Sequence, residues 1–395
     1  MDLLTEIRRA GIGLTRLGQV TFLRLSGGLP PGKSPEVDVA GIRALADRLA
    51  AGAGQGALRA RDLFELPADR PPWFDTGIDL AEGDSVTWIA GGRVYLSALL
   101  DIFVEPHFQL WGRIGDGPVF RGTRGTHTFR AGCPGRLWLA SYFPGEWADP
   151  SGTLATRPED YRALRGSLAV ILLRWSGEPL DGLRALRTVV PHPLWDVEID
   201  RLTNAVARPE GWQYLWFLGE SEIYCAAKGE AGDTEIRCKT RSDVGILQRD
   251  IDLPFAPGTR LLWSWKVDAL PSALAEDILP THDYLSIAVE FSNGIDLTYY
   301  WSAGLAVGKG YWCPLPTWKN REYHVTARSG TEELGHWIDE EKSLYDDYAA
   351  HIGAPPGHIR RVWLIANSMF QRGRGDCAYR SIRIQEPGGT ETRVL

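Results

Sequence analysis

Three residues with acid–base side chains stand together in the C-terminal half of the sequence. In HDYLSIAVEF (282–291), alternate side chains share a face of the expected strand, so Asp283 lies with Leu285 and the apolar residues that follow at every second position. Burial among apolar side chains raises the pKa of a carboxyl group into the range of a general acid or base. His282 and Tyr284 beside it can donate or relay protons. These three residues are the candidate catalytic group.

A second carboxylate is needed if this group performs catalysis. Carboxyl groups catalyse as pairs with contrasting pKa values on either side of the reacting bond. Asp376, next to a Gly-rich turn, is the partner that we expect. An alternative stays open, in which Asp283 forms a buried ion pair with Arg380 and has a structural role, because ion-pair networks also shift pKa values.

Aromatic side chains are the candidates for ligand contact. Trp212, Tyr214 and Trp216 lie on one face of an expected strand, with Glu220 and Glu222 just beyond. An exposed row would be a platform for a sugar or another flat ligand, whereas a buried row would belong to the core. Ligand contacts also concentrate in loops on a rigid scaffold. The further candidates around Gly-rich turns are Tyr299, Trp301, Arg328, His336 and Trp337.

A nucleotide-binding pattern near the N-terminus lacks the chemistry that it needs. SGGLPPGKSP (26–35) contains the phosphate-loop pattern GxxxxGKS. Pro30 and Pro31 have no backbone N–H to offer a phosphate, and Pro35 disfavours a helix directly after the loop. We interpret the stretch as a proline-stiffened turn between two elements.

Motifs for a bound metal or cofactor are missing from the sequence. It contains no Ser-His-Asp order, no GxSxG or HExxH motif and no dinucleotide fingerprint. The cysteines lie far apart, without a CxxC pair or a Cys/His cluster. They are Cys133, Cys225, Cys238, Cys313 and Cys377. We therefore predict no disulfide framework, no metal and no cofactor.

Composition narrows the class of protein. The chain has 395 residues and a net charge of −7, which gives no basic surplus for binding nucleic acid. It shows neither a signal peptide nor a run of 18 apolar residues, so we expect a cytoplasmic protein with reduced thiols. Its 16 Trp, 44 Gly and 25 Pro are typical of a loop-rich β protein.

The order of the elements predicts an all-β protein of two jelly-roll-like β-sandwiches with a short helical N-terminal arm. Residues 1–55 have apolar residues at helical spacing and a mildly basic face, so the arm either docks on a β-domain or makes weak peripheral contact with a membrane. Short apolar runs separated by Gly, Pro and Asp follow in 56–190, and 191–395 is again rich in strands. One helix, DEEKSLYDDYAAHIG, interrupts the last segment.

Residues 56–190 resemble the jelly-roll modules of the galactose-binding, calcium-dependent bacterial lectins. The resemblance lies in WFDTGIDLAEGDSVTWIAGG, RIGDGPVFRGT and GRLWLASYFPGEWADPSGTLA. It implies a sandwich fold. The family's two pairs of oxygen ligands for calcium fall on Ser141 with Tyr142 and on Asp149 with Pro150, so only Asp149 remains and we expect no calcium site.

Residues 191–395 resemble an uncharacterised bacterial domain-of-unknown-function family. The shared pattern lies in HDY, TYYW, RSGTEELGHWIDEEKSLYDDYAAHIG and the closing strands. The resemblance implies no activity. This chain has His282 in place of the family's second acid, and Asn367 and Ser368 within its acidic stretch.

Three hypotheses about function remain after these observations. The leading hypothesis is a carbohydrate-related protein that recognises or processes a glycan, because a lectin-like module is combined with many aromatic residues. The alternative is a cytosolic lyase, cyclase or hydrolase that acts on an apolar small molecule in a Trp-lined pocket, with Asp283 moving the proton. A structural protein without a small ligand is a third possibility, and the sequence sets no oligomeric state.

Overall fold

The computed structural model describes residues 15–16, 18–20, 22, 36–52, 58–70, 72–98, 102–229 and 232–395. The phosphate-loop pattern and most of the basic arm, including Arg8, Arg9 and Arg24, lie outside the described residues. The chain forms two compact units. One unit holds Gly32–Val206 with Trp216–Glu220, and the other holds Ala207–Leu215 and Ser221–Leu395 together with the start of the chain. The domain limits expected at residues 55 and 190 stay a prediction.

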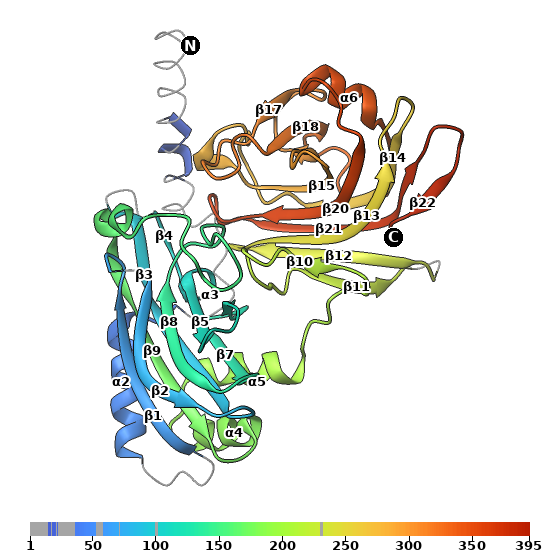
Figure 1. Cartoon of the computed structure of the whole chain (residues 1–395). Helices are drawn as coiled ribbons and strands as arrows, with labels where there is room; N and C mark the ends of the chain where they lie inside the picture. Colours follow the sequence, from blue (N-terminus) through green and yellow to red (C-terminus); the bar gives the residue numbers. More distant parts are fainter. Residues whose placement is uncertain are drawn as a thin grey trace. The chain divides into compact units, whose positions relative to one another are not determined.

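The N-terminal unit is a β-sandwich (Figure 1). One sheet has the order β1-β9-β3-β4, with β7 also paired to β3, and the other has the order β2-β8-β5-β6. Its strands are β1 (Leu58–Pro67), β2 (Trp73–Leu80), β3 (Ser85–Ser97), β4 (Ile102–Val104), β5 (Leu110–Ile114), β6 (Phe120–Arg121), β7 (Thr126–Arg130), β8 (Gly135–Ser141) and β9 (Arg165–Trp175).

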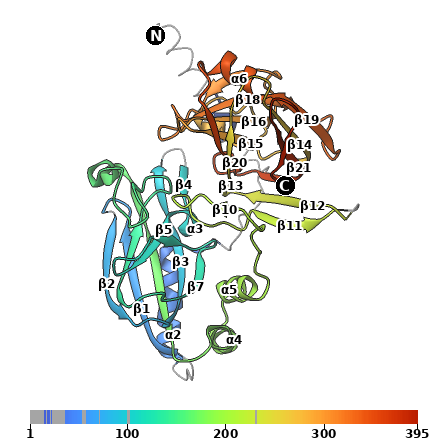
Figure 2. The ribbon, with the colours of Figure 1, turned by 45° about the vertical axis from the view of Figure 1, so that its right-hand side comes forward.

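Helices α2 (Val39–Ala51), α4 (Pro179–Val189) and α5 (Pro193–Thr203) pack on the first of these sheets (Figure 2). In α2 the residues at helical spacing, Ile42, Leu45 and Leu49, are buried against β9 and β3, and the Asp38 side chain accepts a hydrogen bond from the Gly41 N–H at the helix start. Because both faces of β9 are covered, its sequence is a continuous apolar run rather than an alternation. Two short helical segments, α3 (Pro106–Gln109) and η1 (Pro158–Ala163), complete the unit.

The C-terminal unit is a second, larger sandwich. Its seven-stranded sheet has the order β10-β13-β20-β15-β16-β18-β17, and its six-stranded sheet has the order β11-β12-β21-β14-β19, with β22 also paired to β21. Within the seven-stranded sheet, β16 and β18 are parallel and every other pair is antiparallel. The two layers can be followed in Figure 2.

The seven-stranded sheet consists of β10 (Gln213–Tyr214), β13 (Val244–Pro254), β15 (Tyr284–Phe291), β16 (Asp296–Ser302), β17 (Gly310–Trp312), β18 (Glu322–Ser329) and β20 (His358–Asn367). The other strands are β11 (Tyr224–Lys228), β12 (Thr234–Arg241), β14 (Arg260–Ala269), β19 (Ile338–Ser343), β21 (Arg374–Gln385) and β22 (Glu391–Arg393). A short 3-10 helix, η2 (Leu279–Thr281), precedes β15.

The predicted all-β class with two sandwiches is confirmed. The helix expected from DEEKSLYDDYAAHIG begins later than predicted, because its first residues pair with β14 as strand β19, and only α6 (Leu344–His351) is helical. Helices α4 and α5 were not expected. No helix among the described residues is long and apolar enough to cross a membrane.

Candidate functional site

Polar side chains are buried on one face of the seven-stranded sheet. Along β15, β16 and β18 the apolar residues point into the sandwich core, so the alternate residues point to the opposite face. The connection before β15 and the connection between β16 and β18 bring further polar residues to this face. The buried polar cluster, as we call it, consists of Glu276, His282, Tyr284, Asp296, Thr298, Tyr300, Ser302, Tyr311, Cys313, Glu322 and His324.

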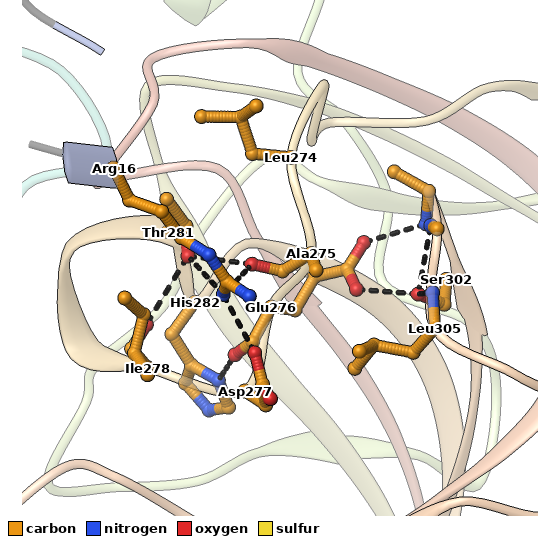
Figure 3. A network of polar contacts seen from close by, with 12 residues as sticks. Arg16, Leu274, Ala275, Glu276, Asp277, Ile278, Thr281, His282, Ser302 and Leu305 are labelled. Carbon is orange, nitrogen blue, oxygen red and sulfur yellow. Dashed lines mark hydrogen bonds and ion pairs between the residues drawn. The ribbon is translucent and has the colours of Figure 1, made fainter. Parts of the chain in front are cut away.

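Glu276 lies at the end of the buried polar cluster that is formed by Ser302, the last residue of β16. Figure 3 shows its contacts with Ser302 and His282. Its carboxylate accepts hydrogen bonds of 2.6 Å from the Ser302 hydroxyl and from the Ala303 N–H, and its carbonyl oxygen lies 2.7 Å from Nδ1 of His282. Burial raises the pKa of Glu276 to about 7. Asp277 beside it points to Arg16 and Lys309, at 2.6 and 2.8 Å.

Glu322 and Asp296 lie at the other end of the buried polar cluster, and their pKa values are shifted in opposite directions. Glu322 accepts a 2.8 Å hydrogen bond from the Tyr284 hydroxyl, and its Oε1 lies 3.3 Å from Nε2 of His324. Burial acts to raise the pKa of Glu322, but the neighbouring His324 lowers it on balance. Burial together with the Glu322 charge raises the pKa of Asp296, to which Thr298 donates a 2.7 Å hydrogen bond. One of the two acids is therefore held ionised and the other protonated.

Two histidines and a cysteine meet between these ends. Burial lowers the pKa of His282 to about 3, so its ring is neutral, and its Nε2 lies 3.4 Å from Sγ of Cys313. The ring of His324 is stacked on Tyr311 at 5.1 Å. His282, Cys313 and His324 are all buried, and their potential ligand atoms lie within 4.8 Å of one another. These are donor groups that could hold a transition metal.

The structure places the predicted catalytic residues in two different surroundings. His282 and Tyr284 belong to the buried polar cluster. Asp283 is also fully buried, but its carboxylate accepts hydrogen bonds from the backbone N–H groups of Phe370 and Gln371, at 2.9 and 2.6 Å. This arrangement fits a carboxylate that fixes a loop.

The suggested partners of Asp283 lie on the six-stranded sheet. Asp376 is in β21 and forms a 2.7 Å ion pair with Arg374. Arg380, the alternative ion-pair partner, has its guanidinium 4.0 Å from the centre of the Trp337 ring, and its Nη1 lies 3.6 Å from Asp233.

Most of the predicted ligand-binding aromatics are in the core. Trp212, Tyr214, Tyr299 and Trp301 are all at most 9% exposed, whereas Trp216 is 38% exposed. The remaining three residues lie near the surface. Arg328 forms ion pairs with Glu333 and Glu340, Trp337 is half-buried, and His336 is exposed.

The sequence analysis missed three neighbouring aromatic side chains at the edge of the seven-stranded sheet, of which Trp312 is exposed and Tyr323 and His351 are half-buried. Trp312 on the edge strand β17 is 39% exposed and stands opposite Tyr323 of β18, with the rings edge to face at 5.0 Å. Tyr323 in turn contacts His351 of α6 at 5.6 Å. We call these three residues the edge aromatic group. The sequence signal was weak, since a three-residue strand shows no clear alternation.

A hollow of about 380 Å³ lies in the N-terminal unit, at the start of β3. Its charged residues already pair with one another, Arg59 with Asp84 at 3.6 Å and Arg130 with Glu178 at 3.0 Å. Trp175 in its wall is only 5% exposed. The hollow therefore presents little apolar surface for a ligand.

Comparison with protein families identifies one related domain. Residues 210–383 match the family described as Protein of unknown function (DUF3047). The resemblance of the C-terminal segment to an uncharacterised family is thereby confirmed. No curated protein matches the sequence.

Several solved structures are similar in part. A PllA-like lectin, the N-terminal domain of EclA, is 17% identical, with 28% of this chain and 94% of that chain covered and a TM-score of 0.22. TmCBM61 in complex with beta-1,4-galactotriose is 10% identical over 45% of this chain and 90% of its own, with a TM-score of 0.24. The xyloglucanase domain of NopAA from Sinorhizobium fredii, in complex with cellobiose, is 8% identical over 47% and 94%, with a TM-score of 0.28. Similarity at this level indicates no function.

Proposed function

We propose that this protein binds a glycan through the edge aromatic group. The observation that supports the proposal is the exposure of Trp312, which is 39% exposed although large aromatic side chains are otherwise concentrated in the core of this unit. A large apolar ring that stays in contact with water next to other aromatic rings is characteristic of a binding surface.

The chemistry of the three side chains suits a sugar. A pyranose ring has an apolar C–H face, which can pack on an indole, and hydroxyl groups at its rim, which need hydrogen-bond partners. Trp312, Tyr323 and His351 each combine a flat ring with a polar tip, and none of the three tips has a hydrogen-bond partner among the described residues. Stacking and hydrogen bonding are therefore available on the same surface.

The framework under these rings is rigid. Trp312 and Tyr323 are directly opposite each other in an antiparallel pair, and the Tyr323 ring also packs against the core. Rings that are already fixed lose little conformational entropy when a ligand binds. The edge aromatic group can therefore bind without a rearrangement of the sheet.

Glycan recognition is better supported than the alternative of a lyase, cyclase or hydrolase that acts on an apolar substrate. That alternative needs Asp283 to exchange a proton with a substrate, whereas both carboxylate oxygens of Asp283 accept backbone hydrogen bonds. It also needs tryptophans around a pocket, whereas Trp263, Trp265 and Trp301 pack on one another within the core.

A binding measurement on the full chain tests the proposal. Calorimetry with a panel of oligosaccharides that includes β-1,4-galactotriose and cellobiose is expected to find a ligand. Trp312→Ala is then expected to weaken its binding about 5- to 30-fold, because a stacked aromatic contributes on the order of 1–2 kcal/mol.

Val307→Ala is the matched control, because Val307 is 61% exposed in the same connection between β16 and β18 but carries no ring. It is expected to leave the affinity unchanged. Binding that is equally strong in Trp312→Ala and in the wild type would contradict the assignment of this surface, and the absence of binding to any glycan of the panel would count against the function.

A further inference from the structure

Donor atoms from three separate segments lie close together inside the C-terminal unit. The ligand atoms of His282, Cys313 and His324 lie within 4.8 Å of one another, and Oε1 of Glu322 lies 3.3 Å from Nε2 of His324. His282 follows η2, Cys313 follows β17, and Glu322 and His324 are alternate residues of β18. All four side chains are at most 2% exposed. We propose that they form a binding site for a zinc ion, with His282 Nε2, Cys313 Sγ, a ring nitrogen of His324 and a carboxylate oxygen of Glu322 as ligands.

The distances between the donor atoms fit this ion. With bonds of about 2.0–2.1 Å to nitrogen or oxygen and about 2.3 Å to sulfur, the ligands of a tetrahedral zinc site lie about 3.3–3.6 Å from one another. Sγ of Cys313 lies 3.4 Å from Nε2 of His282, and Oε1 of Glu322 lies 3.3 Å from Nε2 of His324. The ligand atoms of the two histidines and the cysteine lie within 4.8 Å of one another, so metal binding requires these side chains to move closer together.

The orientation of His282 is the one that metal binding requires. Its Nδ1 lies 2.7 Å from the carbonyl oxygen of Glu276, and a carbonyl can only accept a hydrogen bond. Nδ1 therefore carries the proton, and the lone pair of Nε2 faces Cys313. A backbone carbonyl that fixes the tautomer of a histidine in this way is a regular feature around metal ligands.

His324 provides a second, independent observation. The ring is completely buried, and neither of its nitrogens has a hydrogen-bond partner in the part of the chain that the structure describes. Its Nε2 is near Glu322 but not aligned for a hydrogen bond. A buried polar atom without a partner costs about 1–3 kcal/mol, and a bound ion would remove that cost. A metal ion between His324 and Glu322 would satisfy the free nitrogen.

The types of ligand atom and their total charge favour zinc over calcium and magnesium. A divalent ion with one thiolate and one carboxylate is neutral overall, which suits the interior of a protein. Calcium and magnesium prefer six or more oxygen ligands, whereas imidazole and thiolate prefer zinc and related ions. Binding requires Cys313 to lose its thiol proton to solvent, so zinc uptake releases a proton.

Burial of all four ligands indicates a structural site. A catalytic zinc keeps one position open for water or substrate, whereas a structural zinc is enclosed by protein ligands. Here the ion would tie the connection before β15 and the edge strand β17 to β18. The inference does not depend on glycan binding by the edge aromatic group.

Metal titration of the full chain tests the site. Protein stripped with a chelator is expected to take up one Zn²⁺ per chain and to melt at a higher temperature afterwards. With Co²⁺ in place of Zn²⁺, a charge-transfer absorption from thiolate to metal is expected, which reports on the cysteine in the unmodified protein.

Two variants and one control identify the ligands. Cys313→Ser is expected to weaken Zn²⁺ binding at least a hundredfold and to abolish the charge-transfer band. His324→Phe keeps a ring against Tyr311 and removes both ring nitrogens, so it should fail to bind zinc. Because Nε2 of His324 lies 3.3 Å from Glu322, the folding of this variant is checked by circular dichroism before the titration. Cys133→Ser, a change in the other unit, should bind zinc normally. Folded wild-type protein without micromolar Zn²⁺ affinity, or unchanged binding in both ligand variants, would overturn the proposal.

Discussion

At the scale of single residues, Asp283 illustrates what a strand pattern can predict. The alternation of HDYLSIAVEF places Asp283 among apolar residues, and the residue is indeed fully buried. The pattern cannot predict its partners, because the backbone N–H groups of Phe370 and Gln371 are 87 and 88 residues away in the chain. A catalytic carboxylate and a carboxylate that fixes a loop therefore look alike in the sequence.

The substitution Asp283→Asn distinguishes the two roles. An amide can accept only one of the two backbone hydrogen bonds, and its NH₂ group would face the other N–H. The free energy of unfolding is therefore expected to fall by about 1–3 kcal/mol, measured by chemical denaturation. Asp268→Asn, at an exposed position of β14, serves as the control and should change it by less than about 0.5 kcal/mol. An equally stable variant that has lost its function would instead support the catalytic role.

At the scale of secondary-structure elements, the spacing of apolar residues predicts which side chains of a single strand or helix are buried. The alternation of RLLWSWKVD (260–268) predicts that Trp263 and Trp265 share a buried face with Leu261 and Val267, and the two tryptophans are 2% and 0% exposed. The buried polar cluster could not be found in this way. Its residues come from β15, β16 and β18 and from the connections before β15 and between β16 and β18. They are brought together by strand pairing, including the parallel pairing of β16 with β18, which no local spacing encodes.

Strand β7 carries a histidine that makes the N-terminal unit sensitive to acid. The ring of His127 lies among Trp88, Phe120 and Phe129, and burial, with Arg201 as a second cause, lowers its pKa to about 3. The unfolded chain binds a proton near pH 6.5, whereas the folded protein does not until about pH 3. The stability that this residue contributes is therefore fully present above pH 6.5. It is lost as the pH falls from about 6.5 to about 3.

Replacing His127 is expected to make the stability of the N-terminal unit depend less on pH. His127→Phe retains an aromatic ring among the same neighbours but cannot be protonated. Its melting temperature should therefore depend less on pH between 6.5 and 4 than that of the wild type, as measured by calorimetry. His358→Gln, at an exposed position of the other unit, should leave the slope for the N-terminal unit unchanged. A slope that is the same in His127→Phe and in the wild type would contradict the argument.

At the scale of the whole molecule, the chain contains two compact units with separate cores. Composition and strand spacing predicted two sandwiches correctly. They did not predict helices α4 and α5, which cover the first sandwich, because the sequence analysis assigned residues 56–190 and 191–395 to strand-rich segments. The buried face of that sheet explains the helices, since its apolar residues need a cover.

Two units with separate cores are expected to unfold in two transitions. Leu173→Ala and Leu364→Ala form a matched pair, because both leucines are completely buried in central strands, β9 in one unit and β20 in the other. Each should lower only its own transition, by about 2–5 kcal/mol. Calorimetry of the two variants therefore assigns the transitions, and a single transition that moves in both variants would contradict the division.

Once the two unfolding transitions are assigned, they show which unit a bound metal ion stabilises. If zinc binds within the C-terminal unit, Zn²⁺ at a hundred times its dissociation constant adds about 2.7 kcal/mol to that unit alone. For a unit of this size the gain corresponds to about 5–10 °C. Ca²⁺ should move neither transition. Of the positions that the resemblance to the bacterial lectins implies for calcium ligands, only Asp149 carries a carboxylate, and Asp149 already accepts hydrogen bonds from Ser151 and Thr153. A shift of the N-terminal transition by Ca²⁺ would show that other residues supply a calcium site.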